Sequence, residues 1–237
     1  MFYWLIPLII GFALLSVFLF FRVKEQRVTA VIIKGFVSLM FIATALVAWL
    51  TSKNPNTVFG MFILLGLFFG LLGDILLDIK YIDLNRELLF TRLGFIAFAI
   101  GHVFYVSGLF VYFFDFSASV LYVIIPAIIA LVLMVVTLLM EKFTKVRYEK
   151  MKIFVIFYAI VLFFTTALFM SASIQNGWQN TTVMIMAFAL ISFALSDLIL
   201  NNTYFAPGFS TPVFIITNHI FYYIAQFAIA ASLFFLL

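Results

Sequence analysis

The sequence predicts an all-α membrane protein, a bundle of eight transmembrane helices with almost nothing outside the bilayer. Hydrophobic residues make up 67% of the chain, charged residues make up 9%, and the mean hydropathy is +1.30. This composition leaves too little polar surface to cover a water-soluble particle. The apolar residues fall into runs of about 20, the helix length that crosses about 30 Å of hydrocarbon. We therefore expect one membrane domain, residues 1–237.

The first apolar run, residues 3–21, follows no basic region and contains no small-residue cleavage site. We therefore expect a retained helix and not a signal peptide. Clusters of charged residues, Pro and Asn mark the breaks between this run and those that follow. The later predicted spans are 28–50, 57–78, 88–112, 118–140, 152–172, 181–200 and 212–236.

Basic residues are concentrated on one side of this predicted bundle. Of the 13 Lys and Arg residues, all except Lys53 lie in the first, third and fifth connections or in helix ends that adjoin them. The positive-inside rule assigns that side to the cytoplasm. We therefore expect a multi-pass protein of the plasma membrane with both termini outside the cytoplasm. The net charge of +4 suits contact with anionic membrane lipids, and no long loop exists to carry a nucleic-acid site.

Two parts of the sequence resemble each other. Asp74 and Asp197 occupy equivalent places in the segments 71–78 and 194–201, and the next span in each case carries His-x-Phe-Tyr, at His102 and His219. This similarity predicts two four-helix halves, residues 1–115 and 116–237. An even number of spans per half makes the repeats parallel, related by an axis along the membrane normal, with any shared site at their interface.

Carboxylates in the spans point to a protein-lined interior. An ionised carboxylate in hydrocarbon costs about 2.5–3.5 kcal/mol, so Asp74 and Asp197 must face protein or water. Gly66, Gly70, Asp74 and Asp78 recur every four residues and form one stripe of their helix, which we expect to pack inward. Asp78 lies one turn further out, and we expect it to be a solvated residue at the helix end.

The last span carries a polar face. His219, Tyr222, Tyr223 and Gln226 follow i, i+3, i+4, i+7 spacing in a segment otherwise rich in Phe, Ile and Ala. We expect these side chains to line a polar cavity that opens to the cytoplasmic leaflet.

Asp74 and Asp197 lie within about one turn of the cytoplasmic boundary in the predicted spans, so they are placed to meet across the bundle. A purely structural interpretation stays open, in which the acids pair with Lys34 or Arg92 to fix helix packing. His102 likewise suits an interhelical hydrogen bond as well as a site.

This arrangement resembles the lysoplasmalogenase family, the YhhN-like integral membrane proteins. The resemblance covers the whole chain in span count. Its motifs are Lys34, Gly73-Asp74, Gly101-His102 with Tyr105, Ser196-Asp197 and Tyr222-Tyr223-x-Ala225-Gln226. One position departs from the family pattern, because the usual Lys-Pro is Lys34-Gly35 here, which removes a helix kink and weakens the case for Lys34.

The resemblance implies hydrolysis of the vinyl ether bond of lysoplasmalogens, without a cofactor, to a fatty aldehyde and glycerophosphoethanolamine or glycerophosphocholine. Such a bond is hydrolysed by proton delivery to its β-carbon and capture of the resulting cation by water, which suits two carboxylates. We predict Asp74 and Asp197 as the catalytic pair, without assigning the acid. The predicted substrate-binding residues are Lys34 and Arg92 for the phosphate, and His102, Tyr105, His219, Tyr222, Tyr223 and Gln226.

Two other functions stay open from the sequence. A metal-dependent lipid hydrolase would use His102, His219 and an Asp as zinc ligands. A transporter or lipid-binding protein would also suit parallel repeats and acids within the membrane. Headgroup preference and oligomeric state are open as well.

Overall fold

The computed structural model describes residues 2–53, 57–114 and 119–236, and within these ranges the chain forms eight α-helices. All eight are long and apolar enough to cross a membrane, which confirms the predicted fold class and makes the chain a multi-pass membrane protein. The helices are α1 (Leu5–Val23), α2 (Arg27–Leu50), α3 (Thr57–Ile79), α4 (Glu87–Tyr112), α5 (Leu121–Phe143), α6 (Lys152–Gln175), α7 (Thr181–Phe205) and α8 (Pro212–Ser232). Short 3-10 turns, Leu84–Arg86, Glu149–Met151 and Leu233–Phe235, precede α4, precede α6 and follow α8.

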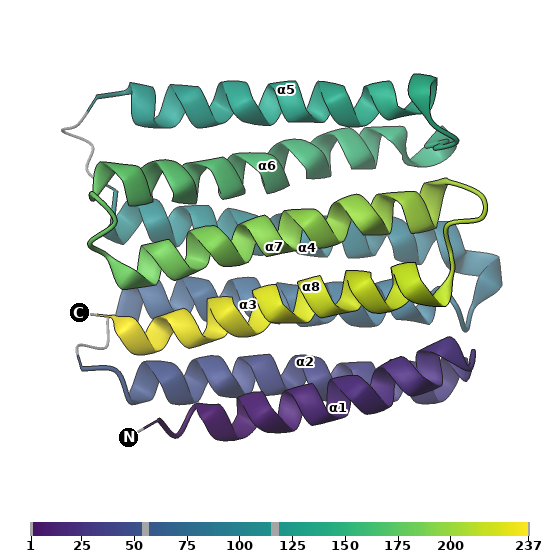
Figure 1. Cartoon of the computed structure of the whole chain (residues 1–237), viewed down its shortest axis with the longest axis horizontal. Helices are drawn as coiled ribbons and strands as arrows, with labels where there is room; N and C mark the ends of the chain where they lie inside the picture. The colour runs from purple at the N-terminus through teal and green to yellow at the C-terminus, as the bar shows by residue number, and fades with distance from the viewer. Residues whose placement is uncertain (1, 54–56, 115–118, 237) are drawn as a thin grey trace.

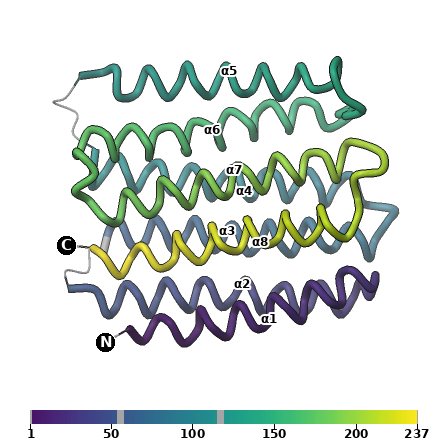
Figure 2. Tube along the Cα trace, viewed as in Figure 1, coloured from purple at the N-terminus to yellow at the C-terminus, as the bar shows by residue number. Residues whose placement is uncertain are grey.

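The helices pack as consecutive pairs, α1 on α2, α3 on α4, α5 on α6 and α7 on α8. The α1/α2 and α5/α6 pairs lie at opposite edges of the bundle, and α3 and α4 lie behind α8 and α7 in the view of Figure 1. The chain enters α1 and leaves α8 at the same end of the bundle (Figure 2). The connections within the pairs lie at the other end, the one that carries most of the basic residues.

The contacts between pairs support the expectation of two similar halves. Helix α4 packs on α6, and α2 packs on α8. If the two halves are equivalent, α4 corresponds to α8 and α6 corresponds to α2. The α4–α6 contact then corresponds to the α8–α2 contact, as a twofold axis along the helices would require. Superposition of the two halves remains the direct test of this expectation.

The largest difference from the predicted spans is in α7, which runs to Phe205 although the prediction ended at residue 200. The prediction took the polar cluster after residue 200 as a break. Polar side chains instead bond back to the helix: the Asn202 amide donates to the Leu198 carbonyl and the Thr203 hydroxyl to the Leu200 carbonyl, both at 2.9 Å. Such local bonds satisfy both polar groups without interrupting the helix.

Helix α5 tolerates a proline because α6 supplies the missing donor. Pro126 lies inside α5 and has no N–H for the carbonyl of Tyr122, four residues earlier. The Ser171 hydroxyl of α6 donates to that carbonyl at 2.7 Å. A side chain of α6 therefore satisfies a backbone carbonyl of α5, which ties the two helices together.

The glycine stripe of α3 allows close packing near the site. Gly66 faces the ring of Tyr105 on α4, and Gly70 faces the amide of Gln226 on α8. A side chain at either position would meet these groups, so α3 approaches both neighbours closely. The inward orientation predicted for the stripe is therefore correct, and it directs Asp74 toward α8.

Candidate functional site

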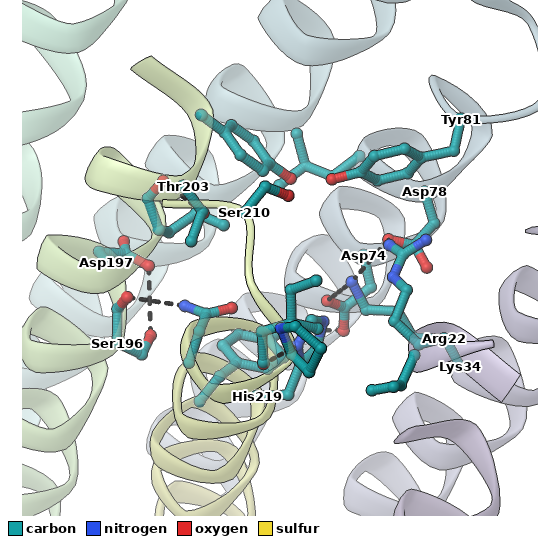
Figure 3. A pocket seen from close by; sticks show the side chains of 18 of the residues that line it. Arg22, Lys34, Asp74, Asp78, Tyr81, Ser196, Asp197, Thr203, Ser210 and His219 are labelled. Atoms are coloured by element: carbon teal, nitrogen blue, oxygen red, sulfur yellow. Dashed lines mark hydrogen bonds and ion pairs between the residues drawn. The ribbon is translucent and has the colours of Figure 1, made fainter. Parts of the chain in front are cut away.

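A polar cavity of about 260 Å³ lies at the end of the bundle that carries the connections within the helix pairs. Figure 3 shows Asp74 and Asp78 on one side of this cavity, Ser196 and Asp197 on the other, and His219 between them. The two halves of the chain therefore each contribute a carboxylate of the predicted pair to one cavity. Five predicted site residues line it: Lys34, Asp74, Asp197, His219 and Tyr222.

Asp74 is buried and fully partnered. Its Oδ2 accepts hydrogen bonds from the Ser38 hydroxyl at 2.6 Å and the Tyr222 hydroxyl at 2.7 Å. Its Oδ1 lies 3.2 Å from Lys34 Nζ. An ammonium and two hydroxyl donors are the partners that a buried carboxylate needs to stay ionised.

Asp78 is not the solvated helix-end residue that the sequence suggested, because only 1% of its surface is exposed. Its Oδ1 lies 2.6 Å from an Arg22 guanidinium nitrogen and 3.1 Å from Lys34 Nζ. Lys34 thus bridges Asp74 and Asp78. The physical reason is the length of α1, which ends at Val23 and so places Arg22 beside the last turn of α3.

Asp197 has a different environment. The Tyr158 hydroxyl of α6 donates to its Oδ2, and the Ser196 hydroxyl lies 3.3 Å from its Oδ1. Across the described ranges, no basic nitrogen lies within ion-pair distance of Asp197. The Asn218 amide of α8 donates to the Ser196 carbonyl at 2.7 Å, which fixes this part of α7 against α8.

Two predicted residues support the cavity from behind. The Gln226 amide donates to the Tyr222 hydroxyl at 2.8 Å, and the Tyr223 hydroxyl lies 3.1 Å from the Ser38 hydroxyl. Both side chains are almost fully buried. They therefore orient the Tyr222 and Ser38 hydroxyls that bind Asp74. Of Tyr222, Tyr223 and Gln226, only Tyr222 lines the cavity.

His219 lines the cavity beside Ile215. Its Nδ1 lies 2.7 Å from the Ile215 carbonyl oxygen, and its ring packs edge-on against Phe18 with 4.9 Å between centroids. An imidazole whose Nδ1 donates to a carbonyl presents Nε2 as an acceptor. With this tautomer, His219 contributes a nitrogen able to accept a hydrogen bond.

The structure does not bring Arg92, His102 and Tyr105 to the cavity. Arg92 faces α6, where its guanidinium donates to the Lys150 carbonyl at 3.2 Å and lies over the Phe154 ring. It therefore cannot share a phosphate with Lys34 in this conformation.

His102 is buried between helices, with centroid distances of 4.9 Å to Phe193 and 5.8 Å to Tyr105. Among the described residues neither of its ring nitrogens has a hydrogen-bond partner, so within that part of the chain the interhelical hydrogen bond considered above is also absent. The His-x-Phe-Tyr similarity failed to identify a shared role because only the copy on α8 faces the cavity.

The residues of the site that the sequence did not indicate include Arg22, Ser38 and Tyr158. Arg22 was assigned to a connection, although it lies one residue beyond the predicted end of the first span. Ser38 follows Lys34 at i+4, a spacing that places both on one helix face and was available as a signal. Tyr158 lies in an apolar run with no periodic polar neighbours, so no local signal indicated it.

The residues considered as zinc ligands are not gathered into one site. Over residues 2–53, 57–114 and 119–236, no group of three or more His, Asp or Glu side chains could hold a metal ion. His102 and His219 have the separate surroundings described above.

Residues 29–233 match the YhhN family, which covers most of the chain. No curated protein and no solved structure matches the chain.

Proposed function

Because the chain belongs to the YhhN family, which includes lysoplasmalogenases, we propose that it hydrolyses the vinyl ether bond of lysoplasmalogens within the membrane. One observation carries the proposal: Asp74 and Asp197 line the same cavity in different electrostatic surroundings. Pairs of acids with contrasting environments are suited to acid/base catalysis. The products would be a fatty aldehyde and a glycerophosphodiester.

The reaction requires one proton and one water molecule. Protonation of the β-carbon of the vinyl ether produces an oxocarbenium ion, which water attacks to form a hemiacetal. The hemiacetal then collapses to the aldehyde and the alcohol of the glycerol backbone. The protein must therefore supply an acid, stabilise a transient cation and accept a proton from water.

We assign the acid to Asp197 and the anionic partner to Asp74. Asp197 is partly buried and has no cationic partner among the described residues, so its neutral form is less disfavoured than that of Asp74, although its two hydroxyl donors favour the charged form. Asp74 beside Lys34 keeps its charge, so it suits stabilisation of the cation and deprotonation of water. Nε2 of His219 is available to orient that water.

The phosphate of the substrate requires a cation other than Lys34 and Arg92, the two predicted from the sequence. Lys34 is occupied by two carboxylates, and Arg92 points away from the cavity. Arg27 lies at the exposed edge of the cavity lining, where its guanidinium donates to the backbone carbonyl of Tyr81 and forms no ion pair with any described residue. We propose that Arg27 contacts the phosphate at the membrane surface.

The test is aldehyde release from a lysoplasmalogen by the purified protein and by Asp74→Asn and Asp197→Asn variants. Each substitution preserves volume and removes an ionisable group, so we expect kcat to fall by about 10²- to 10⁴-fold. The double variant should be little slower than either single one, because both residues serve one reaction. In D₂O the aldehyde should gain one deuterium at carbon 2, the position protonated in the proposed step.

A lysophospholipid with an ester in place of the vinyl ether is the substrate control, and it should not be cleaved. Unchanged rates in folded Asp74→Asn or Asp197→Asn protein would contradict the assignment of the acids. A protein that binds the lipid but releases no aldehyde would instead support the transporter or lipid-binding alternative.

A further inference from the structure

A second, apolar cavity lies along the outer side of the bundle. It measures about 810 Å³ and is formed by α5, α6 and α7. Its lining is almost entirely hydrocarbon and runs nearly the whole length of α5, from Leu121 to Met140. We call this cavity the α5–α7 groove.

A narrow apolar cleft of about 40 Å³ lies between the α5–α7 groove and the polar cavity. At one end it shares Asp197, Leu200 and Tyr204 with the polar cavity. At the other end it shares lining with the groove, including Phe163 and Ala194. Asp197 therefore lies between the polar cavity and an apolar cleft that adjoins the groove.

We infer that the cleft and the α5–α7 groove bind the hydrocarbon chain of a single-chain lipid whose polar end occupies the cavity. The inference rests on the proposed function and names where its substrate's chain lies. A chain in this position passes Asp197 at the point where it joins the polar end. The bond to be cleaved would thus be placed beside the proposed acid.

The orientation of the path matches that of a lipid in a leaflet. The polar cavity lies at the end with basic connections, and the groove extends from it along the helices toward the other end. A chain that moves sideways from the bilayer stays in an apolar environment throughout, so little hydrophobic free energy is gained or lost. The groove would therefore position the chain and add little affinity. The narrow cleft suits one chain and not two.

The functional experiment narrows the path at Ala194, which lies at the junction of cleft and groove. In Ala194→Phe, kcat/KM should fall at least about tenfold for a lysoplasmalogen with an octadecenyl chain, because a displaced chain misplaces the reacting bond. Activity on a butenyl analogue, whose chain ends within the cleft, should remain. Ala13→Phe, on an exposed position of α1, is the matched control and should affect neither substrate. Equal losses on both substrates in folded Ala194→Phe protein would overturn the inference.

A labelling experiment on the unmodified protein tests the path without any activity. A non-cleavable alkyl-ether lysolipid with a diazirine at the end of its chain is bound, irradiated and located by mass spectrometry. We expect cross-links on residues 121–140 of α5 and 163–174 of α6, which line the groove. Cross-links confined to α1 and α2 would overturn the inference. Absence of aldehyde release would instead contradict the proposed function, so the two failures are distinct.

Discussion

Four charged side chains from three helices form a neutral cluster at the base of the cavity. Arg22 and Lys34 face Asp74 and Asp78, and all four are nearly buried. Removing one member of such a cluster leaves an uncompensated buried charge, whereas removing a matched pair does not. The cluster therefore couples the position of α1 to that of the proposed catalytic residue Asp74.

We predict that Asp78→Asn lowers thermal stability strongly. The substitution leaves Arg22 and Lys34 with one carboxylate between them, and breaking a buried pair in this way costs about 3–5 kcal/mol. Adding Arg22→Met should recover most of this loss, because it removes the unpaired cation. Thermal unfolding of the single and double variants in detergent measures the coupling. Additive losses in the double variant would contradict a direct Arg22–Asp78 interaction.

Lys80 provides a pH-dependent element just beyond the last residue of α3. Its side chain is 4% exposed, and Nζ lies 3.1 Å from the centroid of the Tyr204 ring. Burial lowers the pKa of Lys80 from 10.5 to about 7. In the unfolded chain the amine keeps its proton up to about pH 10.5, so between pH 7 and 10.5 the unfolded state binds more protons. Stability from this residue therefore rises with pH across that range.

We predict that Lys80→Met raises the melting temperature at pH 7 and below, where the cost of burying the ammonium is present in full. The difference from the unmodified protein should shrink as the pH approaches 10. Lys53→Met, at an exposed position, is the control and should leave the melting temperature unchanged at each pH. A lower melting temperature for Lys80→Met at pH 7 would show that the ring contact outweighs the cost of burial.

Several site residues could be predicted from sequence because polar groups are conspicuous in an apolar chain. Asp74, Asp197 and Tyr222 were identified in this way, and all three line the cavity. The method could not separate lining residues from supporting ones such as Gln226, because helical periodicity fixes a face but not its distance from a cavity. It also missed Tyr158, whose role depends on the packing of α6 against α7.

At the scale of elements, the backbones of α3 and α4 approach each other closely at two glycines, Gly66 and Gly101. A Cβ atom at Gly101 would lie 2.9 Å from the Gly66 carbonyl oxygen, a backbone atom that cannot turn aside. Gly35 on α2 offers a contrast, since nothing lies within 4 Å of the corresponding position. Gly101 and Gly35 both lie inside helices, so their intrinsic effects on helix formation are comparable.

We predict that Gly101→Ala destabilises the protein by about 1–3 kcal/mol, the usual cost of forcing a group into a packed interior. Gly35→Ala should be neutral or stabilise by up to about 1 kcal/mol, because alanine favours helix. Thermal unfolding of Gly101→Ala and Gly35→Ala, each compared with the unmodified protein, measures the two changes in stability. Equal stability of the two would mean that α3 and α4 separate at little cost, contrary to the close packing observed.

Helix existence was predictable, but helix ends were less so. Eight apolar runs of the right length required eight helices, since backbone groups in hydrocarbon must bond within their own segment. The end of α1 was predicted too early, and this error hid the placement of Arg22. The end of α7 was also predicted too early. Polar residues in a last turn can bond to the helix itself, as Asn202 does, so polarity alone does not mark an end.

At the scale of the whole molecule, the site depends on both halves of the chain. Lys34 and Asp74 come from the first half, and Asp197 and His219 come from the second. The packing of α4 on α6 and of α8 on α2 is what two parallel repeats would produce, and under that hypothesis similar segments bring two acids to one cavity. The surroundings of the acids nevertheless differ, because the partners of Asp74 include a lysine, whereas those of Asp197 are hydroxyl groups. Divergence between similar halves would thus supply the two environments that the proposed chemistry needs.

We predict that the end of the bundle with the polar cavity faces the cytoplasm. All basic residues except Lys53 favour this orientation, and an anionic inner leaflet would attract them. Alkaline phosphatase fused after Leu237 should be active, because that enzyme requires export. A fluorescent protein inserted after Lys145, between α5 and α6, should fluoresce only if this connection is cytoplasmic. The exchanged fusions, each reporter at the other site, are the controls and should be silent at equal expression.

Two different results would contradict this orientation, and they have different consequences. Both sites on one side of the membrane would require an even number of spans between them. Three helices, α6, α7 and α8, separate Lys145 from Leu237, so this result would mean that one of them does not cross. The reverse orientation would retain the fold but turn the cavity to the outer leaflet. Arg27 would then face a surface poorer in anionic lipid, and the proposed substrate would have to be supplied from outside the cell.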